Sequence, residues 1–227
     1  MRRTSRHREW QLCSSASLLQ PVSTSEIDPV SAANNKPGSQ RPRLGVLLSG
    51  TGRTLQNLLD RIDSGHLQAC VAGVASDRDD AFGLQRAMDH GIETRTLRDP
   101  SKIWSWIHEL DCDLILLCGY LRLLPIIPDF EGRVLNIHPA LLPDFGGKGM
   151  YGENVHAAVL KAGVKESGCT VHLCNNNYDD GRMLMQARVP VLPGDTPQKL
   201  GARVFQAECA AYPAAIDMRW QELTGQA

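Results

Sequence analysis

The sequence predicts a doubly wound α/β domain, in which a mostly parallel sheet has helices on both faces and an antiparallel C-terminal extension. Three observations predict this fold. Short apolar runs alternate with amphipathic stretches from Leu44 onward, which is the rhythm of βα units. The runs are apolar on both sides of the strand, as in parallel sheets covered by helices. In the last third of the chain, two apolar runs flank a turn-rich polar loop, which favours antiparallel pairing.

The first half of the chain supplies the parallel strands. Its strands are short apolar runs, of which 114–118 is the most continuous, and its helices end at glycines such as Gly65 and Gly91. In chain order, we expect strand 44–48, helix 55–62, strand 70–75, a helix near 79–90, strand 93–97, a helix near 100–109, strand 114–118 and strand 134–138.

The second half adds the extension. A glycine-rich loop leads to a helix near 153–162, and strands at 170–174 and 184–191 follow. The segment 193–197, Pro-Gly-Asp-Thr-Pro, ends the last strand, and Thr196 or Asp195 is suited to cap a final helix that runs to about Glu208.

The expected domain organisation is one folded domain at 43–220 between two unstructured ends. Residues 1–42 are rich in arginine and serine and show no apolar periodicity, which predicts a disordered extension. This extension has three open interpretations: an organelle transit peptide, a tail without a function, and a start codon placed too early. Residues 221–227 are expected to form a flexible tail.

Composition limits the possible partners. The formal charge of -1, from 24 basic and 25 acidic residues, gives no global field for nucleic acid or an anionic membrane. No apolar run approaches the roughly 20 residues that span a bilayer. The seven cysteines include no C-x-x-C pair, which favours buried reduced thiols and a cytoplasmic location, or an organelle if residues 1–42 are a transit peptide. The histidines show no zinc spacing, so no metal is expected.

The first motif that suggests chemistry is the segment 49–54, Ser-Gly-Thr-Gly-Arg-Thr, between the first strand and the first helix. Glycines there allow the backbone to approach an anion, and a helix N-terminus offers free N–H groups, so a phosphate fits. The third glycine of G-x-G-x-x-G and the Gly-Lys-Ser/Thr of a P-loop are missing, which argues against a dinucleotide or ATP. A plain tight turn between strand and helix is the alternative.

The second motif is Asn136-Ile137-His138-Pro139, at the carboxyl end of an inner strand. Alternate residues of a strand point to the same side, and ligands of open α/β sheets bind beyond the carboxyl ends of the strands. An amide that donates to a carbonyl oxygen and an imidazole that shuttles a proton suit acyl transfer to an amine. The alternative for His138 is a structural histidine.

The third motif is the polar loop 175–181, Asn-Asn-Asn-Tyr-Asp-Asp-Gly. A carboxylate beside an imidazole raises the pKa of the imidazole and can pass a proton through water, a role that Asp179 and Asp180 both fit. A hairpin connection with two solvated acids is the alternative reading of this loop.

Together the three motifs resemble the folate-dependent formyltransferase family over residues 43–217. The family's N-I-H-P-[SA]-L-L-P hallmark matches 136–143 throughout, and its second motif, G-x-T-V-H followed by Y/L-D-x-G, matches 168–172 and 178–181. The stretch 145–152 is similar to one branch of the family. The resemblance implies the formyltransferase fold and selects Asp179 over Asp180 as the acidic group.

The resemblance also implies an activity. The formyl group of 10-formyltetrahydrofolate, the cosubstrate, passes to the amine of glycinamide ribonucleotide in de novo purine (IMP) biosynthesis, without a metal. Asn136 holds the formyl oxygen, His138 stabilises and protonates the tetrahedral intermediate, and Asp179 raises the pKa of His138. The implied cofactor contacts are Lys102, Leu121, Arg122, Leu123, Leu124, Asn136, Asn175, Asn176, Asn177, Tyr178 and Asp179, and the implied substrate contacts are Gly52, Arg53, Thr54 and Glu208.

Two departures from the family pattern concern binding. Gly52-Arg53-Thr54 stands where many members have G-S-N, so an amide is lost and a guanidinium that can pair with phosphate is gained. Asn175-Asn176 replaces the commoner acidic pair, and Leu173-Cys174 replaces an aromatic-aliphatic pair, which weakens the expectation for folate affinity.

Other functions remain as alternatives. Related enzymes formylate other amines or hydrolyse formyltetrahydrofolate; a tRNA enzyme is expected to add a basic C-terminal domain, and a deformylase a folded domain before the sheet. A noncatalytic ligand-binding relative has no need of Asn136, His138 and Asp179 together. A nicotinamide-dependent dehydrogenase is disfavoured by the incomplete glycine pattern. The expected partners are small molecules, and the chain is expected to be a monomer or a homodimer.

Overall fold

The computed structural model describes residues 19–21 and 41–226, which form one eight-stranded sheet in the order β1-β8-β7-β6-β5-β2-β3-β4. The strands are β1 (Leu19–Pro21), β2 (Arg43–Leu48), β3 (Cys70–Ser76), β4 (Thr94–Thr96), β5 (Leu114–Leu117), β6 (Val134–His138), β7 (Glu166–Leu173) and β8 (Met183–Pro190). Strands β4, β3, β2, β5 and β6 pair in parallel, and β7, β8 and β1 continue the sheet with antiparallel pairing. The predicted fold class is therefore confirmed.

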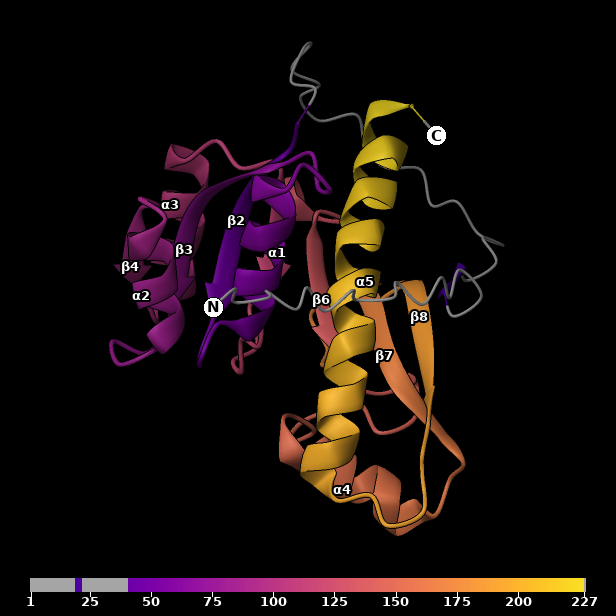
Figure 1. The fold of residues 1–227 in the computed structure, drawn as a ribbon. Helices are drawn as coiled ribbons and strands as arrows, with labels where there is room; N and C mark the ends of the chain where they lie inside the picture. Colours follow the sequence, from indigo (N-terminus) through magenta and orange to yellow (C-terminus); the bar gives the residue numbers. More distant parts are fainter. Residues whose placement is uncertain (1–18, 22–40, 227) are drawn as a thin grey trace, which may run out of the picture.

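Helices cover both faces of this sheet. They are α1 (Arg53–Asp63), α2 (Phe82–Asp89), α3 (Pro100–Glu109), α4 (Glu153–Ala162) and α5 (Pro197–Thr224), with a 3-10 turn, η1 (Pro128–Phe130). Figure 1 shows α5 running the height of the molecule across the sheet, with the α1–α3 half on one side, β7 and β8 on the other, and α4 at its N-terminal end.

The strands divide their side chains between two cores. In β2, Leu44 and Leu48 pack into the core beneath α1, α2, α4 and α5, whereas Leu47 packs with Ile103 and Trp104 of α3 on the opposite face. Successive side chains of a strand point to opposite faces, so an inner strand covered on both sides must be apolar throughout. This requirement explains the continuous apolar runs in the sequence.

The chain changes direction between β2 and β5, which are parallel neighbours at the centre of the sheet. After β2 the chain moves outward to β3 and β4, and after α3 it returns to the other side of β2 as β5. Beyond the two strands the loops meet, because the Ser49 N–H donates to the Gly119 carbonyl over 3.1 Å. Ligand sites of doubly wound sheets form at this kind of switch point.

Most predicted elements appear near their predicted bounds, and three of them, 100–109, 134–138 and 153–162, match the observed ones. Strand β7 begins earlier than predicted, at Glu166, because it pairs along its whole length with β8. Thr196 caps α5 by accepting from the Lys199 N–H over 3.3 Å. Asp195 instead accepts from Leu192 and pairs with Arg203.

The predicted ends of α5 and of the domain are wrong. The helix runs to Thr224 rather than to about Glu208, because its second half is buried across the sheet through residues such as Tyr212 and Ile216. The Tyr212 hydroxyl donates to the Leu135 carbonyl over 2.9 Å. The tail expected to be flexible from 221 is helical to 224, and its Glu222 pairs with Arg182 and Arg219.

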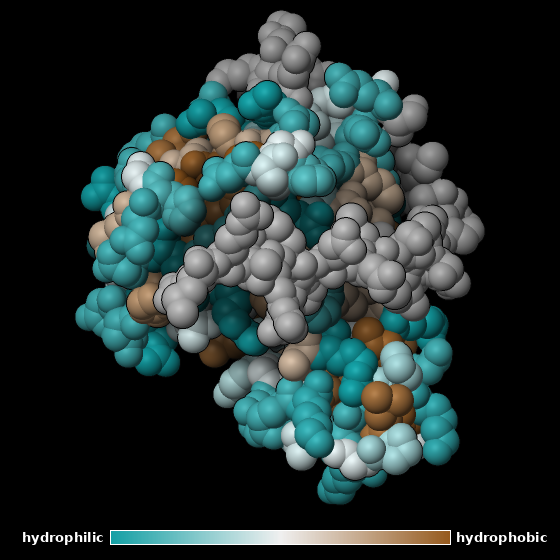
Figure 2. Space-filling model, in the orientation of Figure 1, coloured by the Kyte–Doolittle hydropathy of each residue, from teal (hydrophilic) through white to brown (hydrophobic). Residues whose placement is uncertain are grey.

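Part of the N-terminal segment also departs from expectation. Leu19–Pro21 pair with β8 as the edge strand β1, since β8 otherwise leaves one side of its backbone unpaired. The remainder of the predicted disordered extension, apart from Arg41 and Pro42, lies outside the described residues. Among the described residues, no helix has the length and apolar character needed to cross a membrane. Figure 2 shows a largely hydrophilic face in which apolar residues form small separate patches.

Candidate active site

A cavity of about 740 Å³ opens beyond the carboxyl ends of β5 and β6. It gathers most of the residues that the sequence singled out. These are Asn136, His138 and Asp179; Leu121, Arg122, Leu123 and Leu124; Asn175, Asn177 and Tyr178; and Arg53, Thr54 and Glu208. Segments far apart in the chain thus share one pocket, as expected for a switch-point site.

Strand β6 places two of these side chains. Leu135 and Ile137 pack into the core beneath α5, whereas Asn136 and His138, which alternate with them, point to the other side of the sheet, and both line the cavity. His138 is only 3% exposed. The strand therefore holds an amide and an imidazole side by side at the floor of the pocket.

The imidazole of His138 lies between two acceptors. Its Nδ1 is 3.5 Å from Oδ2 of Asp179, and its Nε2 is 2.9 Å from the carbonyl oxygen of Phe145. A neutral ring donates through one nitrogen only, whereas the imidazolium donates through both. Burial nevertheless holds the pKa of His138 below its usual value, and it outweighs the upward effects of Asp179 and of the Phe145 carbonyl.

This balance refines the expected role of Asp179. The carboxylate does raise the pKa of His138, but the net shift of that pKa is downward because the ring is buried. A cationic His138 is thus costly because the ring is buried, but each of its two N–H groups would face an acceptor.

Asp179 is held ionised at the centre of the site. Its Oδ2 accepts from the Gly147 N–H over 2.9 Å, and its backbone is left-handed with φ of 53°, a conformation that aspartate tolerates better than most residues. Burial raises the pKa of Asp179, but the hydrogen bond from His172, the charge of His138 and the Gly147 N–H together hold it below its ordinary value.

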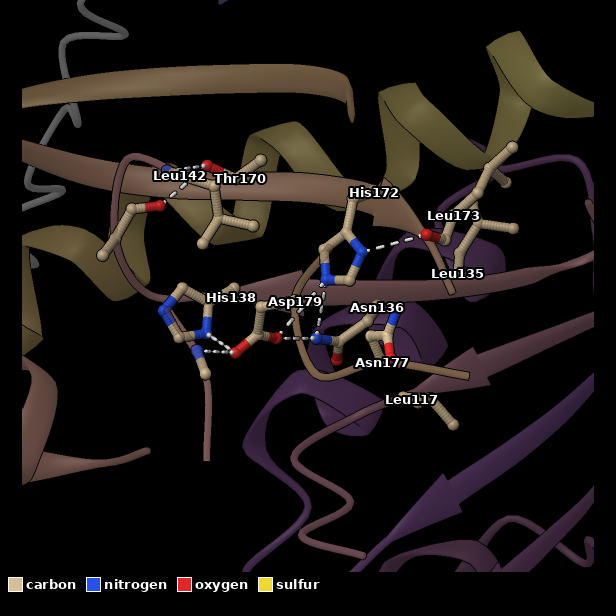
Figure 3. Close-up of polar contacts among 12 residues, drawn as sticks. Leu117, Leu135, Asn136, His138, Leu142, Thr170, His172, Leu173, Asn177 and Asp179 are labelled. Carbon is tan, nitrogen blue, oxygen red and sulfur yellow. Dashed lines mark hydrogen bonds and ion pairs between the residues drawn. The ribbon is translucent and has the colours of Figure 1, made fainter. Parts of the chain in front are cut away.

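His172 is a site residue to which the sequence analysis assigned no role. Its Nε2 lies 3.1 Å from Nδ2 of Asn136 and 3.6 Å from Oδ1 of Asp179, while its Nδ1 contacts the Leu173 carbonyl at 3.0 Å. Figure 3 shows Asp179 between His138 on one side and His172 and Asn136 on the other. The motif G-x-T-V-H contained the signal, because the β6–β7 register sets Asn136 opposite His172.

The far end of the cavity suits an anion. Arg53 and Thr54, the first residues of α1, line it. The first turn of α1 contains no acidic residue and has no side-chain cap, so its free N–H groups and the positive end of this helix are not compensated locally.

Glu208 of α5 lies in the same end of the cavity, partly buried. Burial raises the pKa of its carboxyl to about 7, against a smaller downward effect of the Arg53 charge. At neutral pH this carboxyl therefore exchanges a proton readily, which suits a group that contacts an amine.

Three residues implied by the resemblance are not part of the cavity wall. Lys102 lines a separate surface recess on α3 with Arg95 and Glu109. Asn176 does not line the cavity, and its Oδ1 accepts from the Ile126 N–H over 2.8 Å. A Cβ at Gly52 would meet the Gly83 Cα at 2.5 Å, so the part of Gly52 is to let the loop before α1 pack closely against α2.

Comparison with known proteins agrees with this geometry. The formyl transferase family model matches residues 42–216. A chloroplastic phosphoribosylglycinamide formyltransferase of Arabidopsis thaliana is 34% identical over 220 residues, which cover 89% of this chain and 74% of that protein. The phosphoribosylglycinamide formyltransferase of Escherichia coli is 37% identical over 182 residues, 75% of this chain and 84% of that protein.

Solved structures extend the likeness to three dimensions. The glycinamide ribonucleotide transformylase 1 of Symbiobacterium toebii superposes with a TM-score of 0.72 at 37% identity, covering 82% of this chain and 91% of that one. Fold, cavity and sequence point to the same conclusion, and the chain belongs to the formyl transferase family.

Proposed function

We propose that this chain is a phosphoribosylglycinamide formyltransferase, which moves the formyl group of 10-formyltetrahydrofolate to the amine of glycinamide ribonucleotide in purine biosynthesis. One observation carries the proposal: a single cavity joins the Asn136, His138 and Asp179 cluster to the uncapped, anion-suited first turn of α1. A formyl donor and a phosphorylated amine need this pairing of sites. Relatives that carry the same name support it.

The chemistry follows from the cluster. The acceptor amine attacks the formyl carbon, and a C–N bond forms as the carbonyl oxygen takes up negative charge. The amide of Asn136 contacts Asp179 over a long 3.4 Å, so we assign this N–H to the developing oxyanion. Collapse of the intermediate breaks the bond to the folate nitrogen, which needs a proton.

His138 supplies that proton, and Asp179 stabilises the charged form of His138. The nitrogen of the attacking amine loses a proton as the folate nitrogen gains one, so a group that both accepts and donates balances the reaction. The two acceptors around His138 stabilise its imidazolium during the exchange. The buried setting strengthens these contacts because few waters compete with them.

The folate side of the pocket is assigned to two loops. The loop with Leu121, Arg122, Leu123 and Leu124 supplies apolar surface, and the side chains of Leu121 and Leu123 are exposed. Opposite it, Asn175, Asn177 and Tyr178 supply polar groups. An apolar slot with few polar groups suits a flat pterin ring.

The acceptor side is assigned to Arg53, Thr54 and Glu208. The guanidinium and the first turn of α1 hold the phosphate, and Glu208 faces the glycinamide portion. The proposed location is the cytoplasm, or an organelle if the segment before residue 43 is a transit peptide. Small molecules are the proposed partners, and the proposed assembly is a monomer or a homodimer.

The test is a spectrophotometric assay of the purified chain with 10-formyl-dideazafolate, with and without glycinamide ribonucleotide. Deformylation that depends on the nucleotide, together with formylated product, is the expected result. Deformylation at the same rate without the nucleotide would instead assign a hydrolase. No reaction under either condition would reject the proposed acceptor and donor.

A further inference from the structure

A cation and an aromatic ring meet at the acceptor end of the cavity. The guanidinium carbon of Arg53, the first residue of α1, lies 4.5 Å from the centre of the Phe205 ring on α5. Both residues line the cavity. A guanidinium this close to the face of a ring is attracted by the ring quadrupole, and the contact strengthens where water is excluded.

The backbone beneath Arg53 is fixed independently of Phe205. The Gly83 N–H donates to the Gly50 carbonyl over 3.0 Å, and Arg86 donates to the Thr51 carbonyl over 2.9 Å. Gly52, with φ of 69°, packs against Gly83. These contacts hold the backbone of the loop up to the Cα of Arg53. The side chain of Arg53 is long and exposed, so it can adopt many rotamers.

The first turn of α1 lacks a side-chain cap. Gly52 occupies the N-cap position, where it offers no acceptor to the N–H groups that follow, and the first turn contains no acidic residue. Arg53 and Thr54 of this turn line the cavity, and the Arg53 charge acts on Glu208, which also lines it.

We propose that Phe205 is a positioning residue for the acceptor, whose ring holds the Arg53 guanidinium over the open first turn of α1. Guanidinium and backbone N–H groups then form one preorganised site for a phosphate monoester. The inference rests on the proposed function and deepens it, because it names the group that replaces the side-chain amide common in the family. Preorganisation improves binding by reducing the entropy lost when the ligand orders a flexible side chain.

The test compares F205L, which keeps the bulk and removes the aromatic face, with F205Y, which keeps both. Steady-state rates are measured against glycinamide ribonucleotide and 10-formyl-dideazafolate in turn. F205L is expected to raise the KM for the nucleotide by about 3- to 10-fold. The KM for the folate and kcat should change less than about twofold, and F205Y should restore the wild-type KM.

A double-mutant cycle with R53A separates positioning from simple packing. In the R53A background, F205L should have no further effect on the nucleotide KM, because the group that the ring holds is gone. A full additive effect of F205L in that background would overturn the proposal. So would an equal rise of both KM values, which indicates general damage to the pocket.

The chain offers a matched control. Arg86 lies 5.0 Å from the centre of the Phe82 ring, but Phe82 is exposed and outside the cavity, and Arg86 is also held by Thr51 and Gln56. F82L should leave the nucleotide KM within about twofold, and a rise equal to that of F205L would contradict the proposal. Failure of the proposed function can be told apart from failure of this inference, because the wild-type protein would then show no nucleotide-dependent reaction.

Discussion

Nδ1 of His138 lies 3.5 Å from Oδ2 of Asp179, and the two side chains are only 3% and 11% exposed. The pair joins the last residue of an inner strand to a loop residue in a left-handed conformation. Burial lowers the pKa of His138, and the carboxylate opposes that effect without cancelling it. The pair thus places an ionisable ring beside a carboxylate that favours its charged form, an arrangement that suits general acid–base catalysis.

Replacement of His138 by Ala should remove most of the turnover. The imidazole is the group assigned to the proton transfer, and such groups contribute about 10²- to 10⁴-fold to rate. We expect kcat to fall in that range while the thermal midpoint changes little. The exposed His66 is the control, and H66A should retain the wild-type kcat. Survival of activity in H138A within a few-fold would contradict the assigned role.

Replacement of Asp179 by Asn should shift the pH profile. Asn tolerates the left-handed backbone and still accepts from Gly147, but it removes the negative charge that raises the pKa of His138. That pKa should fall further, so the limb on which kcat declines with rising pH should move to lower pH. Measurement of kcat from pH 5 to 9 tests the shift.

The neighbouring acid provides the comparison for that variant. Asp180 is exposed and accepts from the side chains of Asn175 and Asn177 rather than facing His138. D180N should leave the pH profile unchanged. If D180N shifted the profile and D179N did not, the choice between the two acids would be wrong.

Replacement of His172 by Phe should lower kcat by about tenfold or more, since Asn136 loses the ring nitrogen that it contacts. His172, whose Nε2 lies 3.6 Å from Oδ1 of Asp179, also lowers the pKa of Asp179, so in H172F this pKa should rise and the acidic limb of the profile should move to higher pH. H172Q, whose amide oxygen can accept from Asn136, should recover part of kcat. An altered thermal midpoint with an unmoved acidic limb would indicate a purely structural residue.

Replacement of Glu208 by Gln should change how stability depends on pH. The folded-state pKa, raised to about 7, exceeds the usual value of 4.5, so the stabilising contribution of the protonated carboxyl is complete below about pH 4.5 and is lost as pH rises through about 7. The thermal midpoint of E208Q relative to wild type should therefore increase between pH 4.5 and 8. Parallel curves for the two proteins across this window would contradict a raised pKa.

The sequence alone determined the elements and the motifs, because both are local. The spacing of apolar residues, with a period of two or of 3.6, predicts strands and helices. The N-I-H-P motif belongs to an apolar run, which places it at the end of an inner strand. The parallel pairing of the first strands and the place of Asn136 and His138 beyond a carboxyl strand end followed from general rules of α/β sheets, whereas Asp179 followed from the resemblance to the family.

Only the tertiary structure decided the rest, since it depends on contacts between distant segments. Helix α5 continues through Pro213 because the sheet buries Tyr212 and Ile216, and the local sequence contains a helix breaker at that point. His172 joins the site because the β6–β7 register sets it opposite Asn136. Lys102 does not line the cavity, because its helix, α3, contributes to a separate surface recess. The pKa of Glu208 and the contact of Arg53 with Phe205 depend on burial and distance, which no spacing along one chain encodes.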